Sequence, residues 1–267
     1  MNKEKYRLDI FLVQNGLIET RSKAQQLIKD GLIKVNDKIC RKSGTPVSLK
    51  DKIEVLKNLS YVSRGGIKLE YALKNFKIDV RNKVCLDIGA STGGFTDCLL
   101  QHGAKLVYAV DVGHNQLHPR LKNNPQVLSF EGVDIRNFVL PQDVKVDLIC
   151  VDVSFISLTL ILEVIRKFVD NNGEIIILIK PQFEVGINKI NKKGIVKNEK
   201  DIKDVLKKVL QEAQKLGLSP FGLITSPILG KNGNREYLAY LKLNSKINDN
   251  NKKSIEDLII KLDKNNS

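Results

Sequence analysis

The sequence is poor in cysteine and has no long apolar segment, and each shortage excludes a class of protein. Its four cysteines, at positions 40, 85, 98 and 150, stand 45, 13 and 52 residues apart. This spacing fits neither a zinc site nor a small disulfide-rich domain, so we expect free thiols and a reducing cytoplasm. No uninterrupted apolar run exceeds that of Ile175–Ile179, far short of the roughly 20 residues that span a bilayer. The first residues also lack the continuous apolar stretch of a signal peptide.

Acidic residues are fewer than basic residues in this sequence. The 267 residues include 44 Lys or Arg and 30 Asp or Glu, giving a net charge of +14 and an isoelectric point near 9.5. Such a surplus is typical of a protein that binds a polyanion. With 42% hydrophobic residues, the chain has enough apolar material for a core and does not resemble a disordered protein. The length favours one large domain and a small one.

The small domain is expected over residues 1–60. Thirteen Lys or Arg stand against seven acids between residues 3 and 57. Apolar residues at helical spacing, around Leu8 and again around Leu27, predict two short helices, with Thr20 or Ser22 as a cap of the second. Segments 32–38 and 52–55 alternate as strands, and Asn36-Asp37 predicts a turn. We therefore expect a compact basic α+β module.

The rest of the chain is predicted to be α/β. Apolar segments alternate with amphipathic helices, which favours a parallel sheet covered by helices. Seven strands are expected, at residues 84–88, 106–110, 127–130, 148–151, 174–179, 223–224 and 236–243. The last alternates like an antiparallel strand. Residues 61–80 would form an interdomain linker and leading helix, 81–245 the sheet domain, and 246–267 a polar tail with a short, loosely docked helix over 255–262.

A glycine-rich turn follows the first of these strands. Glycines there let the backbone approach a ligand closely, but the spacing is not that of a dinucleotide site, and Asp87 would repel a diphosphate while attracting an ammonium group. Asp111 and Asp134 follow the next two strands, where they could bind ribose hydroxyls and an adenine amino group. Each acid alone could equally be a cap or turn residue. Together they predict a Rossmann-like methyltransferase pocket for S-adenosyl-L-methionine, formed by Asp87, Gly89, Ala90, Ser91, Gly93, Gly94, Phe95, Asp111, Asp134 and Asp152.

Four further charged residues form a second candidate group. Asp152 and Lys180 each follow an apolar strand, so both should project from the carboxyl edge of a parallel sheet. Glu236 begins the last strand, and Lys68 lies on a helix expected over residues 66–77. Burying an unpaired ammonium group is costly, so lysines in such places require acidic partners. The group is either catalytic or a structural network of ion pairs.

The N-terminal segment RLDIFLVQNGLIETRSKAQQLIKDGLIKVNDKI resembles the S4 RNA-binding domain. The resemblance implies a basic groove for folded RNA, formed by Arg7, Arg21, Lys23, Lys29 and Lys34. The alternative is an ordinary solvated face of charged helices.

Five motifs carry a broader resemblance: LDIGASTGGFTDCLL, VDVSFISL, IKPQFEVG, SRGGIKLEYAL and GNREYL. With these motifs in the family's order along the chain, residues 5–243 or so resemble the TlyA family, whose members join an S4 domain to an FtsJ-like methyltransferase. The resemblance implies 2′-O-methylation of ribosomal RNA, with cytidines of 16S and/or 23S rRNA as the leading expectation. It also implies that Lys68, Asp152, Lys180 and Glu236 are catalytic. One departure is Thr92-Gly93-Gly94, where FtsJ-type turns usually carry Pro-Gly-Gly.

Two other basic segments are candidate RNA contacts. Arg64 lies in the glycine-containing linker, and Lys189, Lys192 and Lys193 lie in a loop directly after Lys180. Such a loop is placed to hold an RNA backbone, although a solvated surface loop would have the same composition.

We therefore expect a cytoplasmic enzyme that acts on ribosomal RNA or ribosomal subunits, with no metal and no stable membrane association. An inactive RNA-binding assembly factor is one alternative. A haemolysin-like membrane-active protein is another, because some members of the resembled family carry that name. The sequence does not predict the oligomeric state.

Overall fold

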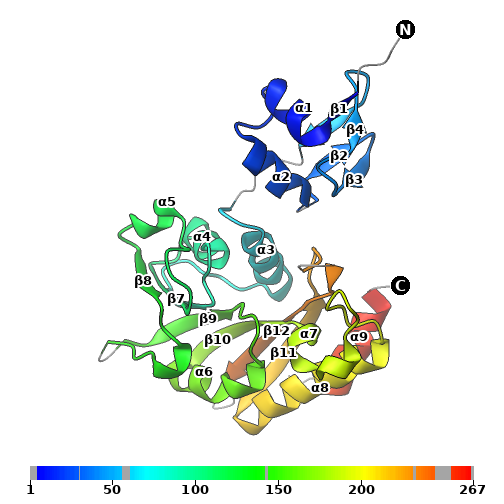
Figure 1. Ribbon diagram of the computed structural model, residues 1–267. Coiled ribbons are helices and arrows are strands. Elements are labelled where there is room, and N and C mark those ends of the chain that lie inside the picture. The colour runs from blue at the N-terminus through cyan, green and yellow to red at the C-terminus, as the bar shows by residue number, and fades with distance from the viewer. Residues whose placement is uncertain are drawn as a thin grey trace. The chain divides into compact units, whose positions relative to one another are not determined.

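The computed structural model describes residues 5–29, 31–55, 61–141, 144–230, 233–243 and 254–265. The chain forms two compact units, Met1–Ser60 and Tyr61–Ser267, both drawn in Figure 1. Each unit is described by itself below.

The N-terminal unit packs two helices on short strands. The helices are α1 (Leu8–Gln14) and α2 (Arg21–Lys29); β3 (Lys38–Cys40), β2 (Ile33–Val35) and β5 (Ile53–Val55) form an antiparallel sheet in that order, and β1 (Tyr6–Arg7) pairs with β4 (Pro46–Val47). Leu8, Leu12, Ile28 and Ile33 are fully buried between helices and strands. Asn36 and Asp37 both have positive φ, as a tight hairpin turn requires, which confirms the predicted turn.

The C-terminal unit contains one seven-stranded sheet, as predicted. Its order is β11-β12-β10-β9-β6-β7-β8. The strands are β6 (Val84–Ile88), β7 (Leu106–Asp111), β8 (Val127–Glu131), β9 (Val146–Val151), β10 (Val169–Ile179), β11 (Leu218–Thr225) and β12 (Tyr237–Leu243). Strand β12 runs antiparallel to both of its neighbours, whereas β6 to β10 are mutually parallel. The predicted antiparallel character of the last strand is confirmed.

Helices cover both faces of this sheet (Figure 1). Because successive strand residues point to opposite faces, Leu148 and Cys150 pack with α3 (Gly65–Phe76) and α4 (Gly94–Gln101), while Ile149 and Val151 face α6 (Leu162–Phe168), α8 (Glu199–Lys215) and α9 (Ile255–Asn265). Shorter elements lie in the connections: α5 (Pro119–Lys122), η1 (Ile135–Asn137), η2 (Leu158–Leu160), α7 (Pro181–Glu184) and η3 (Ile187–Lys189).

The helix expected in the tail is firmly packed rather than loosely docked. Ile255, Leu258 and Leu262 are buried and join the core beside α8. Ion pairs from Lys203 to Asp263 and from Lys207 to Glu256 lie at its exposed side.

The structure bears on the expected state of the cysteines and on the expected lack of a membrane-spanning segment. All four cysteines are free thiols, as predicted. In the part of the chain that the structure describes, no helix is both long and apolar enough to cross a membrane.

Candidate active site

The carboxyl edge of the parallel strands collects the predicted charged residues. Asp152 follows β9, and Lys180 follows β10. Ile179 pairs with Tyr237 across β10 and β12, so the antiparallel β12 brings Glu236 to the edge where Lys180 lies. Ligands of open α/β sheets bind at this edge.

Lys68 and Glu236 form a buried ion pair. Lys68, on α3, places its Nζ 2.6 Å from Glu236 Oε2, and the two side chains are only 8% and 3% exposed. Neither charge is left uncompensated, which is the condition for burying both.

Lys180 and Asp152 form the second ion pair. Lys180 Nζ lies 2.6 Å from Asp152 Oδ1 and donates a hydrogen bond to Ser154 Oγ at 2.8 Å. Burial opposes ionisation of Asp152, but the charges of Lys180 and Lys68 prevail and hold the pKa of Asp152 below its ordinary value. Because Asp152 responds to both lysines, the two ion pairs form one electrostatic group. The structure thus brings all four predicted residues together.

The glycine-rich turn packs directly against this group. Gly89 has a φ of +84°, and a Cβ there would lie 2.5 Å from the backbone oxygen of Asp152. Gly93 has a φ of +91°, and a Cβ there would lie 2.2 Å from Leu121 Cδ1. A side chain at Gly89 would collide with backbone, and the positive φ at both positions strains any residue with a Cβ, so both positions favour glycine.

Two adjoining cavities open beside the turn. The larger, about 490 Å³, is lined by both polar and apolar side chains, including those of Asp111, Gln116, Val133, Ile135 and Phe155. The smaller, about 180 Å³, reaches Lys180. Both are bounded by Gly89, Ser91, Asp152 and Ser154. The larger lies within the range of small-molecule sites, and Lys180 lies in the wall of the smaller one.

Asp111 lines the larger cavity, as expected. Its Oδ2 accepts a hydrogen bond from the Ser91 backbone N–H at 2.8 Å, and its Oδ1 accepts from Gly113 at 2.7 Å. These bonds fix the carboxylate, and each oxygen retains a lone pair for a ligand hydroxyl.

Asp87 and Asp134 lie differently from expectation. Asp87 is fully buried; its Oδ2 accepts from Thr96 Oγ1 at 2.6 Å, while its Oδ1 has no hydrogen-bond partner. Burial, reinforced by the charge of Asp152, raises the pKa of Asp87 to about 7. Asp134 caps η1 and pairs with Arg136. Neither carboxylate lines either cavity, nor does Gly93, so their direct cofactor contacts stay predictions. Gly89, Ala90, Ser91, Gly94, Phe95, Asp111 and Asp152 do line them.

An aromatic pair stands near Lys180. Phe155 is 88% exposed and has a φ of +65°, which is rare for a bulky residue. Its ring centroid lies 5.0 Å from that of Phe183 on α7, and Lys180 Nζ lies 5.9 Å from the Phe183 centroid. An exposed aromatic ring therefore lies close to the second ion pair.

In the N-terminal unit, a buried aspartate organises two of the predicted RNA-binding arginines. Arg7 Nε and Arg21 Nε donate to opposite oxygens of the fully buried Asp9, each at 3.0 Å. Gln25 donates to the same carboxylate at 2.7 Å. The hydrogen bond from Arg7, aided by those from Gln25 and Arg21, keeps the pKa of Asp9 well below its ordinary value against the effect of burial.

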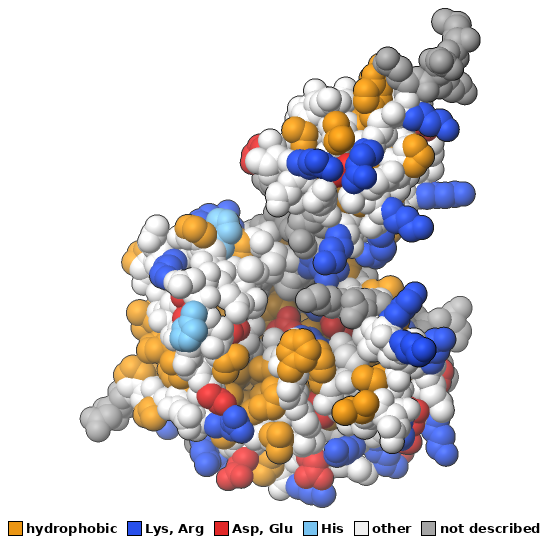
Figure 2. Space-filling view, in the orientation of Figure 1, with side chains coloured by type: hydrophobic (Ala, Val, Ile, Leu, Met, Phe, Trp, Pro, Cys, Tyr) orange, Lys and Arg blue, Asp and Glu red, His pale blue; other side chains and the backbone are white. Residues whose placement is uncertain are grey.

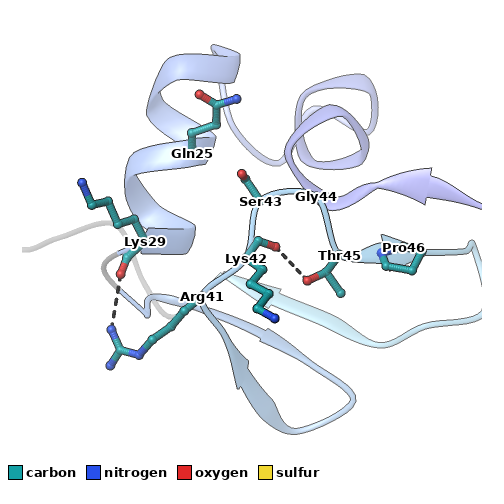
Figure 3. Close-up of a pocket in the computed structure, with 8 residues that line it drawn as sticks. All are labelled: Gln25, Lys29, Arg41, Lys42, Ser43, Gly44, Thr45 and Pro46. Atoms are coloured by element: carbon teal, nitrogen blue, oxygen red, sulfur yellow. Dashed lines mark hydrogen bonds between the residues drawn. The ribbon is translucent and has the colours of Figure 1, made fainter. Parts of the chain in front are cut away.

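The same unit has a cavity of about 740 Å³ whose wall includes Lys29, Arg41 and Lys42. Figure 3 shows Arg41 donating to the Lys29 carbonyl and Thr45 Oγ1 donating to the Lys42 carbonyl. Figure 2 shows further Lys and Arg side chains on the visible face of this unit. Three basic residues around one hollow make it a candidate RNA contact.

The remaining RNA candidates are dispersed. Lys34 lies on β2, partly exposed, and Lys192 and Lys193 are exposed after η3. Lys189 is paired with Asp201, and Arg64, which precedes α3, acts on Asp152 by its charge. The side chain of Lys23 lies outside what the structure describes.

Sequence reasoning missed several polar residues at these sites: Asp9, Arg41, Lys42, Ser154, and Glu184, which accepts hydrogen bonds from Ser157 and Leu158 in the loop after β9. Ser154 and Glu184 stand inside the motifs around Asp152 and Lys180, so their position in those motifs was the available signal. Asp9 gave only the signal of an acid among apolar helix residues. Among the described residues, no group of His, Cys, Asp and Glu is arranged to hold a metal ion.

A Rossmann-like sheet with a small-molecule cavity and a Lys-Asp-Lys-Glu group at its carboxyl edge is the architecture of a methyltransferase. The FtsJ-like methyltransferase family matches residues 61–243, and the S4 domain matches residues 7–53. The chain belongs to the FtsJ-like methyltransferase family and carries an N-terminal S4 domain. Both halves of the resemblance stated from the sequence are confirmed.

Named relatives align over most of the chain. It is 44% identical to Hemolysin A of Brachyspira hyodysenteriae, over 88% of this chain and 98% of that protein. It is 38% identical to the 16S/23S rRNA (cytidine-2′-O)-methyltransferase TlyA of Mycobacterium tuberculosis, over 88% and 89%. A solved structure from Streptococcus thermophilus, also named a hemolysin, is 40% identical with a TM-score of 0.73, over 98% of this chain and 97% of that chain.

Proposed function

We propose that this protein transfers a methyl group from S-adenosyl-L-methionine to ribose 2′-hydroxyls of ribosomal RNA. One observation carries the proposal: Lys180 lies in the wall of the smaller cavity, and its two partners, Asp152 and Ser154, border both cavities. A cofactor in the larger cavity and a ribose near the smaller one would then meet beside a fixed lysine.

The larger cavity suits the cofactor by shape and charge. Val133 and Ile135 offer an apolar wall for an adenine ring, and Asp111 offers acceptors for ribose hydroxyls. Asp111 and Asp152 favour a cationic ligand and disfavour a diphosphate. When bound, S-adenosylmethionine supplies a methyl group made electrophilic by its positively charged sulfur.

Lys180 is the residue we expect to act on the ribose hydroxyl. An ammonium group has three N–H donors, so one remains for the 2′-oxygen beyond those directed at Asp152 and Ser154. Charged Lys180 orients the oxygen and stabilises the negative charge that develops on it. Neutral Lys180 accepts the hydroxyl proton as the 2′-oxygen takes the methyl group and the bond between that methyl group and the donor sulfur breaks. Asp152, Glu236 and Lys68 hold the geometry, which itself contributes to the rate.

The S4 domain and the basic loop would hold the RNA. Arg7 and Arg21 stand on the buried Asp9, and Lys29, Arg41 and Lys42 line the nearby cavity; all suit phosphates. Near Lys180, the exposed Phe155 ring is placed to stack on an unpaired base, a common mode of RNA recognition.

The TlyA relative is named for cytidine 2′-O-methylation of 16S and 23S rRNA. We propose cytidines of one or both ribosomal RNAs as the substrate and the cytoplasm as the place of action. Ribosomal subunits are the expected partners.

The direct test measures transfer of a radiolabelled methyl group from S-adenosylmethionine to purified small and large ribosomal subunits. We expect label on ribose 2′-oxygens with the wild type, and loss of label with Lys180→Ala while cofactor binding by calorimetry is retained. Lys167→Ala, which removes an exposed lysine paired with Glu163, is the control and should methylate normally.

Other outcomes distinguish the alternatives. Label on bases or protein would contradict ribose methylation. Tight RNA and cofactor binding without label on either subunit would favour an inactive assembly factor. Leakage of liposomes by protein that does not methylate RNA would favour the membrane-active alternative.

A further inference from the structure

The loop after β9 is attached to α7 through a carboxylate that the proposed mechanism does not use. Glu184, the last residue of α7, accepts a hydrogen bond from the Leu158 backbone N–H at 2.8 Å on Oε1. Its Oε2 accepts from Ser157 Oγ at 2.6 Å. Both carboxylate oxygens therefore hold the loop that begins at Asp152.

The loop after β9 and the segment of residues 180–184 touch at three other points. Lys180 contacts Asp152 and Ser154, and Phe183 contacts Phe155. Lys180 precedes α7 and Glu184 ends it. The contacts of Glu184 therefore attach the loop at the end of the helix that lies far from Lys180.

The loop needs such an anchor because it holds an unfavourable conformation. Phe155 combines a φ of +65° with 88% exposure. A bulky residue with positive φ is strained, and such strain persists only where the surroundings enforce it. The Phe155 ring is too exposed for packing alone to hold it, so polar contacts at residues 157 and 158 must contribute.

We propose that Glu184 is a positioning residue for methyl transfer. Through Ser157 and Leu158 it holds the loop so that Ser154 stays on Lys180 and Phe155 stays on Phe183. This inference rests on the proposed function. A purely structural Glu184 would instead cap η2 and affect stability alone.

Kinetics on ribosomal subunits separate the two roles. Glu184→Ala removes both acceptors and should lower kcat by about 10- to 100-fold, because displacements near 1 Å cost that much in rate. Cofactor affinity and KM for the subunits should change much less than kcat, since the ion pairs and the opposite wall of the larger cavity, with Asp111 and Val133, remain. Glu184→Gln should restore most of kcat, because its amide oxygen accepts from Leu158 and its amide N–H donates to Ser157. Glu163→Gln, at a 71% exposed position, should change nothing.

A spectroscopic measurement reads the loop without catalysis. The chain has no tryptophan, so Phe155→Trp introduces a single reporter. Without cofactor or RNA, the nanosecond fluorescence anisotropy of this reporter should decay faster when Glu184→Ala is added, and normally when Glu184→Gln is added.

The outcomes are decisive in either direction. Unchanged kcat and anisotropy in Glu184→Ala would overturn the proposal, as would parallel losses of cofactor affinity and thermal stability that account for the lost rate. If Glu184→Ala does not fold, Ser157→Ala removes one of the two bonds, together with the contacts of Ser157 with Thr159. Thr159→Val, which removes only the Thr159 hydroxyl, is its control. Ser157→Ala should lower kcat and speed the anisotropy decay more than Thr159→Val does; equal effects would overturn the proposal. Absence of methyl transfer by the wild type would refute the proposed function. The anisotropy decay would then still show whether Glu184 holds the loop.

Discussion

One aspartate in each unit holds cationic side chains, and these cations differ in exposure. Asp9 holds Arg7 and Arg21, whose side chains are 49% and 56% exposed. Asp152 holds Lys180, whose side chain is 10% exposed. A carboxylate beneath exposed guanidinium groups can fix charge for a large polyanion, whereas a carboxylate beside a buried ammonium group can fix charge for one reacting atom. This difference in exposure is what the proposed binding role of the arginines and the proposed catalytic role of Lys180 require.

The largest expected effect tests whether the buried pairs are catalytic or only structural. Lys68→Met leaves Glu236 buried without a partner and should lower the free energy of unfolding by about 3–5 kcal/mol. The double variant Lys68→Met/Glu236→Leu should recover most of this stability, because apolar residues often replace a buried pair well. It should not recover methyl transfer. Urea unfolding and the transfer assay measure the two quantities, and recovery of both would make the pair purely structural.

Asp87 extends the comparison to a buried aspartate without a cation. Its pKa of about 7 in the fold lies above the ordinary 3.8, so the folded state binds the proton more tightly than the unfolded state. Its contribution to stability is therefore present at low pH and lost as the pH rises from about 4 to about 7.

Asp87→Asn should remove this loss. At pH 8 the variant should be more stable than the wild type by a few kcal/mol, at about 1.4 kcal/mol per pKa unit, and the difference should shrink towards pH 4. Urea unfolding across this range, with the exposed Asp79→Asn as control, provides the measurement. A stability difference that does not change with pH would contradict the assignment.

Asp9→Asn tests the binding side of the comparison. Loss of the carboxylate should free Arg7 and Arg21 and weaken RNA binding by about tenfold, since hydrogen bonds to charged groups are the strong ones, without changing cofactor affinity. The direction of the change in RNA affinity is informative, because the variant also loses one negative charge. Tighter RNA binding would show that charge matters and orientation does not. Asp37→Asn, which alters an exposed pair with Lys52, adds the same charge and serves as the control.

The smallest effect is expected in the basic loop. Lys192→Gln/Lys193→Gln should weaken RNA binding a few-fold and reduce the slope of log affinity against log salt by about two, as two phosphate contacts are lost. At saturating RNA, kcat should be unchanged. Filter binding at several salt concentrations measures the slope, and an unchanged slope would mean that these lysines are merely solvated.

The sequence predicted the sheet because each strand combines a short apolar run with a turn signal. It also predicted that Asp152 and Lys180 share one edge, since the carboxyl edge follows from strand direction, whereas Lys68 and Glu236 were assigned to the same site through the resemblance. It did not predict that Lys68 pairs with Glu236, because these residues stand 168 positions apart and their contact depends on where β12 inserts. Nor did it predict the hydrogen bonds that Asp9 and Glu184 accept from other segments. Such contacts depend on how the chain folds and leave no periodic pattern in the sequence. Asp87 was expected to contact the cofactor; in the structure it is fully buried and lines neither cavity.

The place of β12 in the sheet has a consequence for folding. This strand is the last of the seven in the chain, yet it lies between β10 and β11 rather than at an edge. The sheet is therefore complete only when the C-terminal strand has inserted, a non-local step that is intrinsically slow. Glu236 arrives with that strand, so a nascent chain that ends before it has Lys68 without its partner. On the proposed function, catalytic competence would then be acquired in a single step with the insertion of β12.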